Sequence, residues 1–173
     1  MRKLLIVVDM QNDFIDGSLG TPEAQQIVRP VCEEIGKYAA ENIFATRDTH
    51  TEQYLKTSEG KNLPVPHCIK GTKGWEIRPE VARALGAARI VDKPSFGSPE
   101  LAEEIRRISE QEPVDVTLVG LCTDICVVSN ALLLKAAMPE VPIHVIASCC
   151  AGVTPATHEA ALTTMKMCQI DVK

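Results

Sequence analysis

Features typical of secreted and membrane proteins are missing from this sequence. Its seven cysteines are an odd number, and none forms a Cys-x-x-Cys pair of the zinc or thioredoxin kind. That pattern favours a reduced, cytoplasmic protein over a secreted disulfide framework. The apolar run near the start is short, because Asp9 ends it before a signal peptide or a membrane span would be complete. We therefore expect a cytoplasmic protein with no membrane partner.

Clustered positive charge is also missing. The net charge is −5, and the lysines and arginines are scattered along the chain. This distribution argues against nucleic acid or an anionic membrane as the main partner. A small molecule is the expected ligand.

Repeats, low-complexity tracts and linkers are absent as well, so we expect one domain over residues 1–173. A chain of this length buries about 70% of its unfolded surface on folding. Neither a disulfide nor a structural metal is needed for folding.

What the sequence contains is a regular alternation. Short apolar runs rich in β-branched residues alternate with segments of helical spacing. The runs cover residues 4–8, 43–46, 89–91, 116–121, 143–147 and, more weakly, 169–172; the predicted helices cover residues 22–40, 124–138 and 155–167, with a further one that begins at Ser98. Strands that are apolar on both faces and alternate with helices predict an α/β fold with a doubly wound, mainly parallel sheet.

Cys126 is the candidate nucleophile. It follows an apolar strand and a tight turn at the start of a predicted helix, where unpaired backbone N–H groups favour a thiolate and a developing oxyanion. The alternative is a buried structural cysteine.

Asp9 and Lys93 each lie at the end of another predicted strand. In parallel sheets the ligand crevice lies beyond these carboxyl ends. Asp9 there could act as a general base, and Lys93 could pair with it. Each also has an ordinary alternative, a turn aspartate and a solvated lysine.

A long irregular segment, residues 48–74, holds a second cluster of candidate residues. Asp48, His50, Glu59 and His67 are of the types that bind Zn²⁺, Fe²⁺ or Mn²⁺. The alternative is an ordinary polar loop.

Three other side chains are assigned structural positions. We expect His144 to be a hydrogen-bonded core histidine, His158 to lie on a helix surface and Trp75 to pack on the core.

Several motifs follow one another along the chain, at residues 7–14, 46–50, 66–68 with 71–74, Lys93, and 120–127. In this order they resemble the isochorismatase-like cysteine hydrolase superfamily, most closely its nicotinamidase branch. The resemblance implies a three-layer α/β/α fold with about six strands.

By this resemblance Asp9, Lys93 and Cys126 match a catalytic triad. Cys126 would attack an amide carbonyl, Asp9 would carry the proton and Lys93 would hold the ion pair. The backbone N–H groups of Cys122 and Cys126 would form the oxyanion hole, and the Leu121–Cys122 peptide would be cis.

The resemblance also implies a divalent metal ion (Zn, Fe or Mn) and no organic cofactor. Asp48, His50 and His67 match the ligands, and Glu59 falls where some members supply a fourth. The ion would position the pyridine nitrogen of nicotinamide. Many relatives form dimers or tetramers, so a homo-oligomer is expected.

The presence of Cys126 implies an amidase, because isochorismatases proper act on a vinyl ether and lack this cysteine. The nicotinamidase branch implies that the reaction is hydrolysis of nicotinamide to nicotinate and ammonia. Phe14 and Phe96 are expected to hold the flat ring, although residues 63–65 lack the aromatic common in nicotinamidases. One alternative is an amidohydrolase acting on an N-carbamoyl, ureido or other small amide. Another is a non-catalytic binding protein or a redox sensor that uses Cys122 and Cys126.

Overall fold

A six-stranded, entirely parallel sheet forms the centre of the protein in a computed structural model that describes residues 1–173. Its strand order is β3-β2-β1-β4-β5-β6. The strands are β1 (Arg2–Val8), β2 (Ile43–Asp48), β3 (Arg89–Lys93), β4 (Val114–Leu121), β5 (Ile143–Ala151) and β6 (Asp171–Val172). The predicted doubly wound α/β fold is therefore confirmed.

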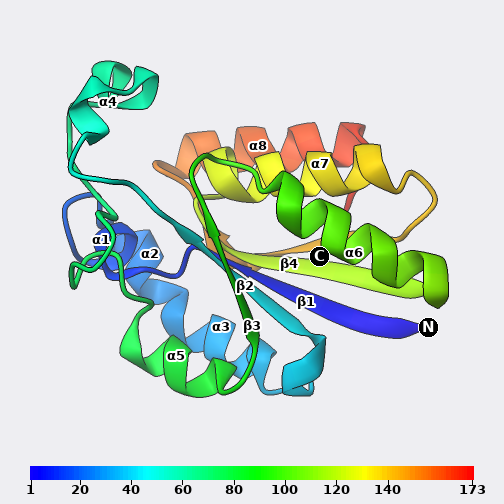
Figure 1. Ribbon diagram of the computed structural model, residues 1–173. Helices are drawn as coiled ribbons and strands as arrows, with labels where there is room; N and C mark the ends of the chain where they lie inside the picture. The colour runs from blue at the N-terminus through cyan, green and yellow to red at the C-terminus, as the bar shows by residue number, and fades with distance from the viewer.

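Helices cover both faces of this sheet (Figure 1). One face carries α6 (Pro99–Gln111), α7 (Val128–Ala137) and α8 (Pro155–Met167); the other carries α1 (Asn12–Ile15), α2 (Pro22–Gln26), α3 (Val28–Ile35) and α5 (Pro79–Leu85). The remaining elements are η1 (Ala40–Asn42), η2 (Tyr54–Lys56), α4 (Ser58–Asn62) and the π-helical turn η3 (Thr123–Val127). The layers are those of the expected α/β/α arrangement.

Two hydrophobic cores hold the layers together. Along β1, Leu4 and Ile6 enter a core of 22 buried residues under α6, α7 and α8, whereas Leu5 and Val7 enter a core of 19 under α3 and α5. Successive strand residues point to opposite faces, so a strand covered on both sides is apolar throughout. This is why β1 reads as an unbroken apolar run.

The helix predicted over residues 22–40 is in fact two helices. The chain forms α2, passes through Ile27 and starts again as α3, so that Pro30 lies in the first turn of the new helix. Proline has no N–H to donate to the preceding turn and is tolerated only there. The spacing of apolar residues continues across the break, which is why the pattern alone does not reveal it.

The carboxyl end of β4 packs against β1 at a glycine, Gly120, which is paired with Val8. Gly120 has a φ of +119°, and a Cβ there would lie 2.1 Å from the carbonyl oxygen of Val8. Only glycine fits both the conformation and the space. The approach brings the turn after β4 beside Asp9. No helix in the structure is both long and apolar enough to cross a membrane.

Candidate active site

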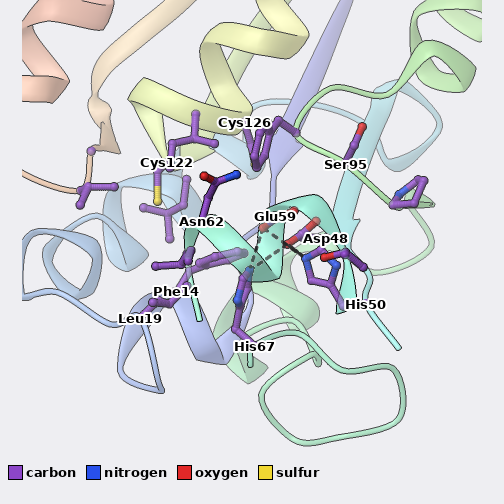
Figure 2. Close-up of a pocket in the computed structure, with 18 of the residues that line it drawn as sticks. Phe14, Leu19, Asp48, His50, Glu59, Asn62, His67, Ser95, Cys122 and Cys126 are labelled. Atoms are coloured by element: carbon purple, nitrogen blue, oxygen red, sulfur yellow. Dashed lines mark hydrogen bonds and ion pairs between the residues drawn. The ribbon is translucent and has the colours of Figure 1, made fainter. Parts of the chain in front are cut away.

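A cavity of about 750 Å³ opens beyond the carboxyl ends of the strands. Figure 2 shows residues from several elements pointing into it, among them Phe14 after β1, Asp48 at the end of β2 and Cys126 after β4. The short helix α4 supplies Glu59 and Asn62 from the long segment after β2. Parallel strands gather their carboxyl ends at one edge, so residues far apart in sequence share this cavity.

Asp9 and Lys93 form a buried ion pair at the base of the site. Lys93 Nζ lies 2.7 Å from Asp9 Oδ2, and neither side chain is exposed. The hydroxyl of Thr46 donates to Asp9 Oδ1 at 2.6 Å, and Lys93 Nζ also donates to the carbonyl of Ser95 at 2.9 Å. Both charged groups are therefore fixed in orientation.

Cys126 lies directly against this pair. Its Sγ is 3.4 Å from Lys93 Nζ, and the residue is buried in η3 rather than in a regular α-helix. The three residues expected to act together therefore meet at one place.

The charges around Cys126 differ from expectation. Burial raises the pKa of the Cys126 thiol well above its usual value, and the Asp9 carboxylate adds to this more than Lys93 offsets. Burial also raises the pKa of Asp9. For Lys93, burial lowers the pKa, but the neighbouring negative charges outweigh this and the net shift is upward. These shifts favour a neutral thiol beside the ion pair, whereas the position of Cys126 after a tight turn favours a thiolate.

The turn before Cys126 has the backbone geometry implied by the resemblance. The Leu121–Cys122 peptide bond is cis, which confirms that prediction. Cys122 follows β4 directly and also lines the cavity. The backbone of this turn therefore borders the space next to the Cys126 thiol.

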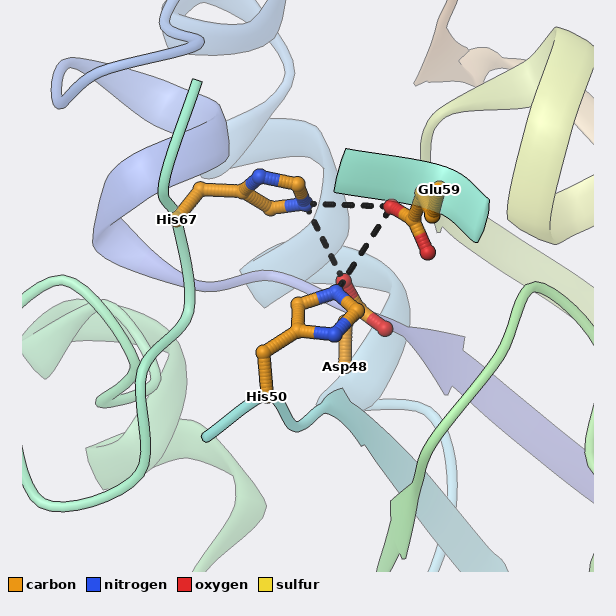
Figure 3. A group of neighbouring side chains, drawn as sticks. All are labelled: Asp48, His50, Glu59 and His67. Carbon is orange, nitrogen blue, oxygen red and sulfur yellow. Dashed lines mark hydrogen bonds and ion pairs between the residues drawn. The ribbon is translucent and has the colours of Figure 1, made fainter. Parts of the chain in front are cut away.

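The four predicted metal ligands converge on one side of the cavity (Figure 3). Four distances between their ligand atoms are 2.9 Å (His50 Nε2 to Asp48 Oδ2), 3.4 Å (His67 Nε2 to Asp48 Oδ2), 3.6 Å (His50 Nε2 to Glu59 Oε1) and 3.5 Å (His67 Nε2 to Glu59 Oε1). Around a tetrahedral Zn²⁺ with bonds of about 2.0–2.1 Å, ligand atoms lie roughly 3.3–3.4 Å apart. Two imidazoles and two carboxylates at this spacing fit a divalent ion.

Hydrogen bonds and charges around these ligands favour the same use. His67 Nδ1 lies 2.8 Å from the carbonyl oxygen of Val65, which holds the proton on Nδ1 and leaves Nε2 free to bind an ion. Burial tends to raise the pKa of Asp48, but hydrogen bonds with His50 and His67 outweigh it and hold that pKa below its usual range. The lowered pKa of Asp48 favours the ionised carboxylate that a metal ion would need.

Asp48 also joins the two clusters. Its Oδ2 faces the histidines, while its Oδ1 is buried 3.7 Å from Lys93 Nζ. One carboxylate thus borders both the ion pair and the metal-binding group, so the two belong to a single site.

Residues 3–172 match the family model described as the isochorismatase domain. The chain belongs to the isochorismatase family.

Several relatives in this family have been named for an amidase activity. The chain is 27% identical to the nicotinamidase/pyrazinamidase of Mycobacterium tuberculosis, over 98% of this chain and 97% of that protein. It is 25% identical to the nicotinamidase of Schizosaccharomyces pombe, over 97% of this chain and 91% of that protein. A crystal structure of the pyrazinamidase of Pyrococcus horikoshii in complex with zinc has 30% identity and a TM-score of 0.83, covering 100% of this chain and 99% of that one.

The aromatic residues of this isochorismatase-family site divide into two groups. Phe14 is buried with its ring centroid 5.5 Å from that of His67, and Phe96 lies exposed at the cavity wall. Trp75 is outside the cavity, where its N–H donates to Thr49 and the Arg47 guanidinium stacks on its ring at 3.8 Å. Only the two phenylalanines are placed to meet a ligand.

Two residues support the site through hydrogen bonds that the sequence does not predict. The Gln11 amide pairs with the backbone of Asp48, accepting its N–H at 2.7 Å and donating to its carbonyl at 2.8 Å. Asn130 donates to the carbonyl of Cys126 at 2.8 Å and accepts the N–H of Ser98 at 3.0 Å. Gln11 lies within the motif at residues 7–14. No sequence pattern marks Asn130, because its role depends on backbone groups that only folding brings beside it.

Proposed function

We propose that the protein is a cysteine amidohydrolase that converts nicotinamide into nicotinate and ammonia. The observation that carries the proposal is that Cys126 and the metal-binding group line one cavity, while the buried Asp9–Lys93 ion pair contacts Cys126. The names of the mycobacterial and fission-yeast relatives support the same substrate. A small amide is the expected partner, and the homo-oligomer stays a prediction.

The first half of the reaction forms a thioester. Asp9 takes the proton of the Cys126 thiol as the sulfur bonds to the amide carbonyl carbon. While the proton is on Asp9, the Lys93 ammonium stabilises the negative charge that develops on the sulfur. The backbone N–H groups of Cys122 and Cys126 donate to the carbonyl oxygen as it becomes an oxyanion. Asp9 then returns the proton to the amide nitrogen, the C–N bond breaks and ammonia leaves.

The second half consumes one water molecule. Asp9, ionised again, takes a proton from water as its oxygen attacks the thioester carbonyl. The C–S bond then breaks, the acid is released and Cys126 regains a proton. The raised pKa of Asp9 makes it a better proton acceptor than an ordinary carboxylate.

Asp48, His50, Glu59 and His67 are the residues that would hold a divalent ion. Such an ion supplies a Lewis-acidic point that can bind or polarise a pyridine nitrogen, directly or through water. Phe14 packs against His67 and would place the ring beside this group. The ring would thereby be oriented with its carboxamide toward Cys126.

A second substrate class is favoured by the aliphatic part of the cavity wall. Leu19, Leu63, Ile125 and Val153 line the cavity, so a non-aromatic carbamoyl or ureido compound is the nearest rival. A redox role is less well supported, because burial raises the pKa of both Cys122 and Cys126, whereas redox-sensing cysteines have a low pKa.

The deciding experiment measures ammonia released from nicotinamide, pyrazinamide and several N-carbamoyl and ureido compounds, with and without chelator. We expect release from the two aromatic amides, lost on Cys126→Ala by roughly 10³-fold or more. Cys168→Ala is the control, because Cys168 is exposed and does not line the cavity. Release only from carbamoyl or ureido compounds would replace nicotinamide by the rival class, and full activity of Cys126→Ala would refute the mechanism.

A further inference from the structure

The segment joining β5 to α8 forms hydrogen bonds with the turn that carries Cys122 and Cys126. The backbone N–H of Val153 donates to both carboxylate oxygens of Asp124, at 3.2 and 3.1 Å. Asp124 lies between the two cysteines in η3. The wall of the cavity at Val153 is therefore tied to the turn itself.

A second contact reaches the turn from α8. The hydroxyl of Thr123, which is fully buried, lies 2.8 Å from His158 Nδ1 and makes no other hydrogen bond. With the ring proton on Nε2, Nδ1 accepts the hydroxyl hydrogen. The expectation of a surface histidine is wrong, because the His158 side chain is only 17% exposed. Sequence spacing placed it on the outside, but folding turns it toward η3.

Gly152 makes this contact sterically feasible. A Cβ at this position would lie 2.9 Å from both the backbone nitrogen and the Cβ of His158. A larger residue would push the first turn of α8 away from the end of β5. The close approach therefore lets His158 reach Thr123.

We propose that His158 is a positioning residue: through Thr123 it fixes the turn whose backbone N–H groups, at Cys122 and Cys126, receive the substrate oxyanion. This inference rests on the proposed function. Thr123 immediately follows Cys122 and begins the turn that ends one residue after Cys126. Anchoring Thr123 limits rotation of the peptide groups on either side of it.

Loss of His158 should affect the tetrahedral transition state more than the binding of the substrate. Oxyanion-hole donors act on charge that develops in the transition state, and small displacements of such donors are costly. Losing His158 leaves the donors present but less well fixed. We expect kcat to fall by about tenfold in His158→Ala, with little change in KM, since a single deleted donor costs about 10²–10³.

The variants separate positioning from packing. His158→Asn keeps an acceptor near the position of Nδ1 and should restore most of the activity. Thr123→Val removes the hydroxyl at nearly constant volume, and combining it with His158→Ala should cost no more than either change alone. Thr164→Ala, an exposed change on the same helix, is the control and should match the parent protein. Circular dichroism melting confirms that each variant is folded.

Two chemical probes of Cys126 complete the test. Pyridine-3-carboxaldehyde adds the thiol across its carbonyl, and the resulting hemithioacetal oxygen lies where the oxyanion would form. Iodoacetamide alkylates the same sulfur in a reaction that forms no oxyanion and therefore does not depend on the oxyanion hole. In His158→Ala, aldehyde affinity should fall with kcat, while the alkylation rate stays that of the parent protein.

Unchanged aldehyde affinity, or an equal loss in the alkylation rate, would overturn the inference. So would failure of His158→Asn to restore activity while folded. If the parent protein releases ammonia from no amide, the proposed function fails, but the aldehyde measurement still tests His158.

Discussion

Lys93 Nζ lies 2.7 Å from Asp9 Oδ2, and neither side chain has any solvent exposure. Lys93 ends β3 and Asp9 directly follows β1, and β2 separates these two strands in the sheet. The long lysine side chain spans the intervening strand, so the pair links three strands at the edge where the cavity opens. An ion pair in this setting is costly to break, because each partner left alone is a buried, unpaired charge.

Lys93→Met should destabilise the protein by about 3–5 kcal/mol, because Asp9 would lose its partner. Adding Asp9→Asn should recover part of this loss, since the orphaned charge is removed as well. Urea unfolding of the two single variants and the double variant measures the loss of stability and its partial recovery.

The surface provides the comparison. Arg29 and Glu33 pair on an exposed face of α3, so Arg29→Met should leave the unfolding midpoint unchanged. A Lys93→Met protein as stable as the parent would show that the buried charges are not coupled as the distance indicates.

The pH dependence of kcat/KM should show an acid limb controlled by Asp9. Burial raises the pKa of Asp9 above its usual 3.8, and only the ionised form accepts the thiol proton. Activity should therefore fall as the pH drops through this raised pKa and be retained above it. A pH–rate profile measures the limb, and its position at or below the ordinary carboxyl range would contradict the role of Asp9.

Removing one metal ligand should release the ion. The four ligand atoms lie within 4.8 Å of one another, so we expect about one Zn, Fe or Mn per chain by elemental analysis. His67→Ala should lose most of this metal and lower the melting temperature, because an ion present at 100 times its Kd stabilises the fold by about 2.7 kcal/mol.

His144→Ala is the matched control for that experiment. Its ring lies between Asp115 and Asp171 and is not among the ligands. Equal metal content in His67→Ala and the parent protein would show that His67 is not a ligand.

Gly120→Ala should destabilise the protein by at least about 1–3 kcal/mol, since its Cβ would lie 2.1 Å from the Val8 carbonyl oxygen. It should also lower activity, because the displaced strand end carries the turn with Cys126. Gly36→Ala is the control, with its nearest neighbouring atom 3.5 Å from the added Cβ. A shift in the unfolding midpoint for Gly36→Ala as large as for Gly120→Ala would contradict the steric argument.

Much of the fold could be predicted from sequence because the pattern is periodic. Strands buried on both faces read as apolar runs, and β1 to β5 lie where such runs occur. The break between α2 and α3 was missed because the apolar spacing continues through it. Strand ends were extended by pairing that no local pattern contains, as in β5, which runs to Ala151.

For the candidate site, the sequence predicts which residues lie at strand ends but not how they contact one another. Asp9, Lys93 and Cys126 could be singled out because each lies at or just beyond the end of a strand, and parallel strands end together. Their ionisation could not, because burial and mutual distance exist only after folding. A position at the start of a helical turn favours a thiolate for Cys126, whereas burial of the sulfur, and then the Asp9 carboxylate, raises the thiol pKa.

By itself, then, the sequence determined the layered α/β fold and the residue types at the strand ends, since local periodicity and residue chemistry are written along the chain. The tertiary structure alone decided that Asp48 borders both the ion pair and the metal-binding group, and that His158 faces Thr123. Those relationships depend on distances between elements, and on the water excluded around them, which no stretch of sequence specifies.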